Sequence, residues 1–127
     1  MPTITLVLAG LAAALHVGFF YLESIAFRKP FAHRTFGVTN PDDVEVLVFP
    51  LLNQGFYNLF LAVGTLVGVI GTASGWKPQG PTLVVFGCLF MIGAALVLVA
   101  SRPALWRGAL IQGLLPLLAL VAALIWR

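Results

Sequence analysis

Charged residues are scarce in this chain of 127 residues. Lys, Arg, Asp and Glu together make up 9% of it, whereas hydrophobic residues make up 61%. A soluble globular domain is about 25% charged and about 45–50% apolar. The shortage of charge therefore excludes an ordinary soluble domain and favours a protein of the lipid bilayer.

Reactive and metal-binding residues are equally few. The one cysteine, Cys88, can form no internal disulfide, and its apolar surroundings favour a small packing residue over a nucleophile. His16 and Glu23 are seven residues apart without further ligands, and His33 lies in a loop, so a metal site is not expected. There is no nucleophile motif, phosphate-binding loop or haem-ligand pair, and we expect no cofactor.

Long apolar runs dominate what is present. Spanning a bilayer as a helix takes about 20 mainly apolar residues, and four runs qualify, at about residues 3–27, 46–72, 82–101 and 104–126. The runs are continuously apolar rather than alternating, which argues against a water-filled membrane β-barrel. The first run is too long for a signal peptide and lacks a basic start. We predict one integral membrane domain over residues 1–127, an all-α bundle of four transmembrane helices with up-down topology.

The basic residues divide unequally between the two sides of such a bundle, as Arg28, Lys29, Arg34, Arg102 and Arg107 against Lys77 and Arg127. Basic loops stay in the cytoplasm, so the first and third loops are predicted there and both termini outside. The net charge of +3 therefore reflects topology and contact with lipid head groups. A nucleic-acid partner is not expected.

The second helix carries its own start signal and a breaker. Asn40 is suited to the N-cap and Pro41 to the first turn, so this helix should begin before its apolar part. Pro50 predicts a kink, because proline removes a backbone hydrogen bond and clashes with the preceding turn. The Gly64 and Gly68 step favours close packing within the molecule first, and a homodimer contact second.

Polar residues inside the apolar runs are the candidate site. They are His16, Glu23, Asn53, Gln54, Tyr57, Asn58 and Gln112. At about 1.5 Å of rise per residue, all fall at overlapping depths in the cytoplasmic half. We predict a shared pocket with His16 and Glu23 as the candidate catalytic pair and the other five as ligand-binding residues. Asn53, Tyr57 and Asn58 are expected toward His16. The alternative is simple adhesion between helices, at about 0.6 kcal/mol for each hydrogen bond, with Glu23 paired to Arg107.

Four segments, residues 16–23, 36–38, 53–62 and 112–120, resemble a family of small bacterial four-helix membrane proteins, the domain of unknown function numbered 1304. The shared pattern has His and Leu-Glu in helix one, Asn-Gln-Gly-x-Tyr-Asn in helix two and Gln-Gly in helix four. Leu15 and Phe27 depart from it, at positions where Glu and Trp are expected. The resemblance implies the topology, a bacterial inner membrane and the same polar residues, but no activity.

Three functions remain open. The first is binding of a lipophilic small molecule, with acid–base chemistry on an isoprenoid- or sterol-like compound, since His16 and Glu23 could transfer protons. The second is a small proton-coupled exporter that resembles small multidrug-resistance proteins in architecture alone. The third is a structural or accessory role. Membrane lipids are expected partners in every case.

Overall fold

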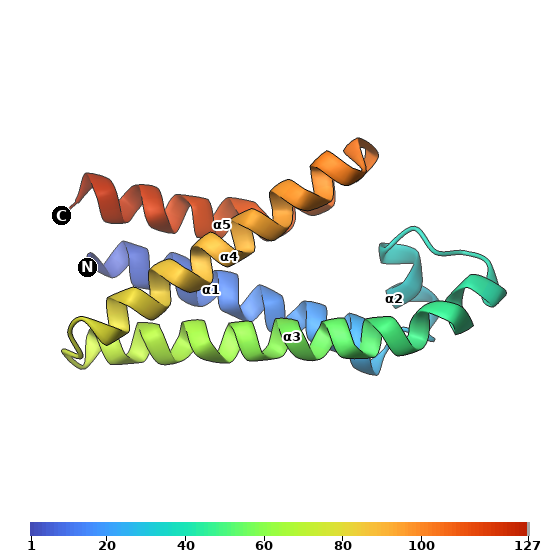
Figure 1. Cartoon of the computed structure of the whole chain (residues 1–127), viewed down its shortest axis with the longest axis horizontal. Coiled ribbons are helices and arrows are strands. Elements are labelled where there is room, and N and C mark those ends of the chain that lie inside the picture. Colours follow the sequence, from blue (N-terminus) through green and yellow to red (C-terminus); the bar gives the residue numbers. More distant parts are fainter. Residues whose placement is uncertain (127) are drawn as a thin grey trace. The chain divides into compact units, whose positions relative to one another are not determined.

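The computed structural model describes residues 1–126 and builds them from helices alone (Figure 1). The elements are α1 (Thr3–Phe20), the π-helical turn η1 (Tyr21–Ile25), α2 (Pro30–Thr35), α3 (Pro41–Ala73), α4 (Gln79–Ser101), the 3-10 turn η2 (Pro103–Leu105) and α5 (Trp106–Ile125). Within residues 1–126 there is no strand. Arg127, counted above among the basic residues, lies outside the described part.

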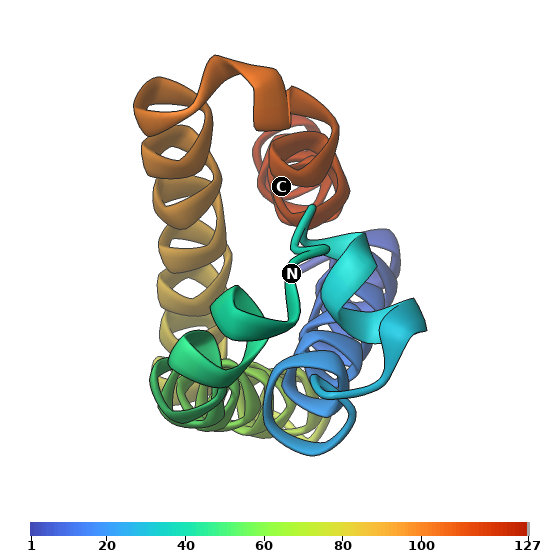
Figure 2. The same ribbon diagram turned by 90° about the vertical axis from the view of Figure 1, so that its right-hand side faces the viewer.

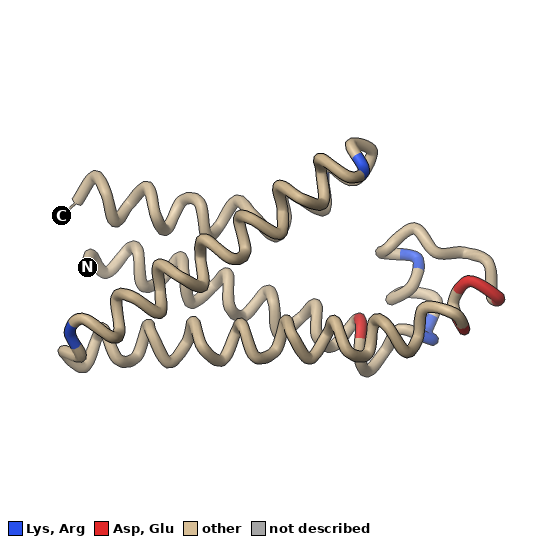
Figure 3. The backbone as a smooth tube through the Cα atoms, in the orientation of Figure 1, with Lys and Arg blue, Asp and Glu red and all other residues tan. Residues whose placement is uncertain are grey.

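Four helical stretches are long and apolar enough to cross a membrane. They are Thr3–Ile25, Pro41–Ala73, Gln79–Ser101 and Pro103–Ile125. These stretches confirm the predicted all-α fold and make the protein a multi-pass membrane protein. Charged residues gather near the ends of the long helices and in the connections between them (Figure 3).

Helix α3 begins where its sequence signals place the start. The Asn40 side chain accepts a hydrogen bond from the Asp42 N–H at 2.9 Å, which satisfies a free donor of the first turn. The helix has 33 residues and continues through Pro50. Its first turns are inclined to the rest of the helix (Figures 1 and 2), as expected beside a proline that lacks an N–H.

The connection between the first two spans is more ordered than a hydrophilic loop. It contains the short helix α2, where His33 is buried and its Nδ1 lies 2.6 Å from the Val38 carbonyl oxygen. The buried Phe27 ring packs against the rings of His33 and Phe36, with centroids 6.3 and 6.2 Å away. These aromatic contacts hold the segment in a small folded cap, which the apolar periodicity of the sequence did not indicate.

The chain forms two compact units. The first comprises residues 1–15 and 62–126, which include parts of α1 and α3 and the whole of α4 and α5. Its core contains Ala9, Val84, Cys88 and Ala119, all fully buried. Figure 2 shows α4 running from the end of α3 to the turn that leads into α5. Cys88 is thus a packing residue, as predicted.

Helices α3 and α4 of this unit meet through residues without side-chain bulk. A Cβ on Gly80 would lie 2.5 Å from the Thr72 backbone nitrogen, and one on Gly68 would lie 2.7 Å from the Leu83 Cβ. Pairing of residue 68 with 83 and of 72 with 80 makes the two helices antiparallel. Gly68 therefore packs within the molecule, as the first interpretation of the glycine step expects, whereas a Cβ on Gly64 would meet open space.

Candidate functional site

The second unit, residues 16–61, holds Glu23 on the widened turn that ends the first span. In this turn the Ala26 N–H donates to the Tyr21 carbonyl at 2.9 Å, the five-residue spacing of a π-helix. Such turns are rare and frequently mark functional positions. The Glu23 side chain is 4% exposed, so the turn carries a carboxylate into the interior of the unit.

Both oxygens of the Glu23 carboxylate are held by amides of α3. Gln54 Nε2 donates to Oε1 at 3.1 Å, and Asn58 Nδ2 donates to Oε2 at 2.9 Å. Gln54 and Asn58 are four residues apart, so their side chains project from one face of the helix. The two amides therefore fix the carboxylate in position and orientation.

A second contact fixes the turn itself. The Ser24 hydroxyl donates to the Leu52 carbonyl oxygen at 2.8 Å. Gly55 permits this approach, because a Cβ there would meet the Ser24 hydroxyl and lie 3.0 Å from the Ser24 Cβ and 3.2 Å from the Glu23 Cβ. The glycine in the middle of the polar motif is therefore a requirement of packing between η1 and α3.

A cavity of about 230 Å³ adjoins the carboxylate. Its lining combines Glu23, Ser24 and Arg28 with four apolar side chains, those of Ile25, Phe27, Val48 and Leu52. At its outer end the Arg28 guanidinium donates to both Glu45 carboxylate oxygens, each at 3.2 Å, and both side chains are largely exposed. These hydrogen bonds raise the pKa of Arg28, which stays charged. The cavity therefore combines the Glu23 carboxyl group and the ion-paired Arg28 with apolar side chains.

The other predicted site residues lie in different surroundings. His16 is 2% exposed on α1, with its ring 5.1 Å from that of Phe19. Asn53 and Tyr57 are exposed, Tyr57 at 68%, and their orientation toward His16 stays a prediction. Each precedes by one residue an amide that donates to Glu23, and successive side chains differ by about 100° around the helix.

One predicted site residue lies in the other unit, and three residues near Glu23 were not predicted. Gln112 is partly buried on α5 in the first unit, and its place in a pocket with Glu23 stays a prediction. Ser24, Gly55 and Arg28 were not predicted as site residues. Gly55 lies inside the Asn-Gln-Gly motif and Ser24 directly follows Glu23. Their position beside predicted site residues was the one feature of the sequence that could have indicated them.

The four apolar helices define a multi-pass, all-α membrane protein. Within that class, the chain matches the model of the family described as "Protein of unknown function (DUF1304)" over residues 10–124 and belongs to this family. The match includes Glu23, Gln54 and Asn58, and the resemblance drawn from the sequence is thereby confirmed. No curated protein and no solved structure matches the chain.

Proposed function

We propose that Glu23, held by Gln54 and Asn58, forms the binding site for a lipophilic small molecule that carries a hydroxyl or another hydrogen-bond donor. The observation that carries the proposal is a carboxylate that is 4% exposed within an apolar span and has both oxygens anchored. Ionisable groups at membrane depth are costly and are usually retained for function. Two amides hold this one in place, and Ser24 fixes the turn that carries it, as a binding site requires.

The chemistry of the ligand follows from the unused capacity of the carboxylate and from the cavity walls. An ionised carboxylate has about four acceptor positions, and two are occupied by the amides. A ligand hydroxyl can use another. The cavity of about 230 Å³ is below the roughly 300–1,000 Å³ of drug-sized pockets. It would hold the polar end and the first carbons of an isoprenoid- or sterol-like molecule, with the remainder in lipid.

The proposal extends to acid–base chemistry on such a compound. A carboxylate that accepts a hydrogen bond from a ligand hydroxyl can act as a general base and take the hydroxyl proton during a reaction of the ligand. His16 is the second buried titratable group of the same span. We propose it as the second proton-transfer group, beside Glu23. Binding is the primary claim, and catalysis depends on it.

The test compares the affinity of the protein for an isoprenoid alcohol with its affinity for a similar hydrocarbon that lacks the hydroxyl. Purified protein in detergent is titrated with farnesol and with farnesene, and Glu23→Gln is the variant. A hydrogen bond to a charged group contributes about 1.5–3 kcal/mol, which corresponds to roughly 10–100-fold in affinity. Glu23→Gln should lose this margin for farnesol and bind farnesene as before.

Tyr57→Phe is the matched control, because it also removes one polar group from α3 but from an exposed side chain. It should bind farnesol normally. Equal binding of the alcohol and the hydrocarbon by the unaltered protein contradicts the proposal. So does full farnesol binding by Glu23→Gln.

A proton-coupled exporter is the second candidate, favoured by one feature of the site. The hydrogen-bond partners of Glu23 are neutral amides, which leave its negative charge available to a cation or a proton. In proteoliposomes, uptake of tetraphenylphosphonium driven by a pH gradient, abolished in Glu23→Gln, would favour this reading. Unchanged behaviour of Glu23→Gln in both assays would favour the structural role.

A further inference from the structure

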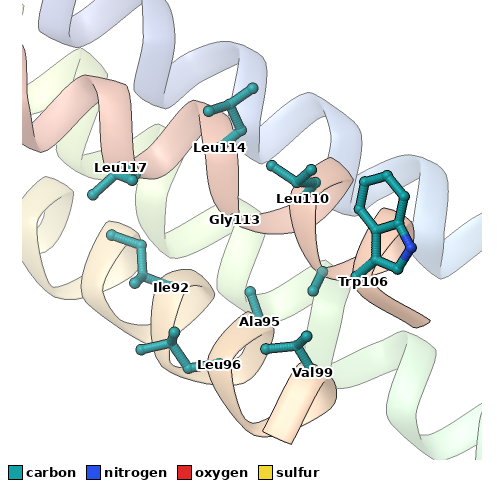
Figure 4. Close-up of a pocket in the computed structure, with 10 residues that line it drawn as sticks. Ile92, Ala95, Leu96, Val99, Trp106, Leu110, Gly113, Leu114 and Leu117 are labelled. Carbon is teal, nitrogen blue, oxygen red and sulfur yellow. The ribbon is translucent and has the colours of Figure 1, made fainter. Parts of the chain in front are cut away.

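A second cavity lies in the first unit, between α4 and α5, away from any charged lining residue (Figure 4). It measures about 310 Å³ and is lined by ten residues, of which nine have apolar side chains and the tenth is Gly113. A Cβ on Gly113 would lie 2.8 Å from the Ala95 Cβ, so the two helices approach closely at this level. Leu96 and Leu110 stand on its two sides and are 61% and 48% exposed. The cavity is therefore an open apolar groove.

One end of the groove carries an aromatic residue and basic residues. Trp106 lines this end (Figure 4), and the Arg107 guanidinium carbon lies 5.3 Å from the centroid of its ring. Arg102 follows α4 directly as its C-cap residue, four positions before Trp106. Tryptophan is enriched at the membrane–water interface. The apolar groove thus ends at an interfacial aromatic residue, with the Arg107 guanidinium against its ring and Arg102 four positions earlier in the sequence.

The dimensions of the groove fit one hydrocarbon chain. Its α5 wall runs from Trp106 to Leu117, which at 1.5 Å per residue is about 16 Å, close to half of the roughly 30 Å hydrocarbon core. Its volume of about 310 Å³ over that length gives a mean cross-section of about 20 Å². A helix about 10 Å wide would need roughly 80 Å². The groove therefore matches the width of one hydrocarbon chain rather than that of a whole helix.

We infer that this groove is a binding site for an anionic phospholipid, with one acyl chain between α4 and α5 and the phosphate at Arg107 and Arg102. Basic pockets between membrane helices favour anionic head groups, because each nearby Lys or Arg adds electrostatic attraction. Arg107 also has its guanidinium placed at the groove by Trp106. This site is independent of Glu23 and of the function proposed for it.

Quenching of Trp106 fluorescence by brominated lipid tests the inference. Trp76→Phe and Trp126→Phe leave Trp106 as the only tryptophan, and the protein is placed in phosphatidylcholine vesicles. These contain the same small fraction of dibrominated phosphatidylglycerol or dibrominated phosphatidylcholine. The brominated phosphatidylglycerol should quench more strongly, and its preference should fall about fivefold for each of Arg102→Gln and Arg107→Gln.

Two further variants separate a groove from general surface attraction. Val99→Phe fills the groove from α4 with both arginines intact, and it should reduce the preference for phosphatidylglycerol. Lys77→Gln makes the same charge change at the turn between α3 and α4, and it should leave the preference unchanged. Equal quenching by the two lipids overturns the inference, as does a preference that survives Val99→Phe. Quenching by neither lipid would mean that a second copy of the chain covers the groove, and it also overturns the inference.

Discussion

Replacement of Gly55 by alanine should loosen the attachment of η1 to α3. The added Cβ would meet the Ser24 hydroxyl and lie 3.0 Å from the Ser24 Cβ, so the hydroxyl must leave its 2.8 Å hydrogen bond to the Leu52 carbonyl. Loss of that bond costs about 1 kcal/mol, and overpacking adds about 1–3 kcal/mol. Higher helix propensity of alanine returns about 1 kcal/mol. The expected net destabilisation is about 1–3 kcal/mol.

A double-mutant cycle tests whether Ser24 is the cause. Ser24→Ala removes the clashing hydroxyl and keeps the Cβ, so Gly55→Ala should cost less in that background. We expect a coupling of about 1 kcal/mol, as is usual for residues in contact. Gly64→Ala is the matched control on the same helix, because nothing lies within 4 Å of its added Cβ. It should be neutral or stabilising.

Thermal unfolding in detergent measures these differences. At about 4 °C per kcal/mol for a chain of this size, Gly55→Ala should lower the melting temperature by roughly 4–12 °C. The packing argument is refuted if Gly55→Ala is as harmless as Gly64→Ala. Strict additivity of Gly55→Ala and Ser24→Ala would also refute it, because the two changes would then act at unrelated places.

Further predictions concern the carboxylate, the topology and the exposed ion pair. Asn58→Leu removes one of two donors to a buried carboxylate, worth about 1.5–3 kcal/mol, and should lower the melting temperature far more than Tyr57→Leu; equal effects would contradict the site geometry. Cysteines introduced as Thr35→Cys and Gln79→Cys should label from opposite sides of the membrane, the first from the cytoplasm. Labelling of Thr35→Cys from outside intact cells would reverse the proposed orientation. Arg28→Gln breaks only an exposed ion pair and should leave the melting temperature unchanged within error, whereas a clear drop would show a larger role.

The spans could be predicted from sequence because the hydrocarbon thickness sets how many apolar residues a helix needs. The start of α3 could also be predicted, since the cap at Asn40 depends on local chemistry alone. Burial of Glu23 and its contact with Asn58 followed from depth and from the adjacency of consecutive helices.

The face that α3 turns toward Glu23 could not be predicted. Asn53, Gln54, Tyr57 and Asn58 place polar groups on two adjacent faces, and periodicity cannot rank two polar faces of a helix in lipid. Packing between the two elements selects the face, because the absence of a side chain at Gly55 lets η1 approach α3. The π-helical turn was missed for a similar reason, since nothing local in residues 21–25 opposes an ordinary α-helical turn.

The glycine contacts of α4 have a consequence for mutational tolerance. This helix is apolar all around, so lipid and protein core would accept almost any rotation of it about its axis. The orientation of α4 about its axis is instead set by glycines, whose missing side chains let α3 approach. Gly80 admits the backbone of Thr72, and Gly87 admits the Thr65 side chain. Exchanges among apolar residues should be widely tolerated along the outward side of α4, whereas Gly80 accepts no added carbon without displacing the α3 backbone, and an added carbon at Gly87 would displace the Thr65 side chain.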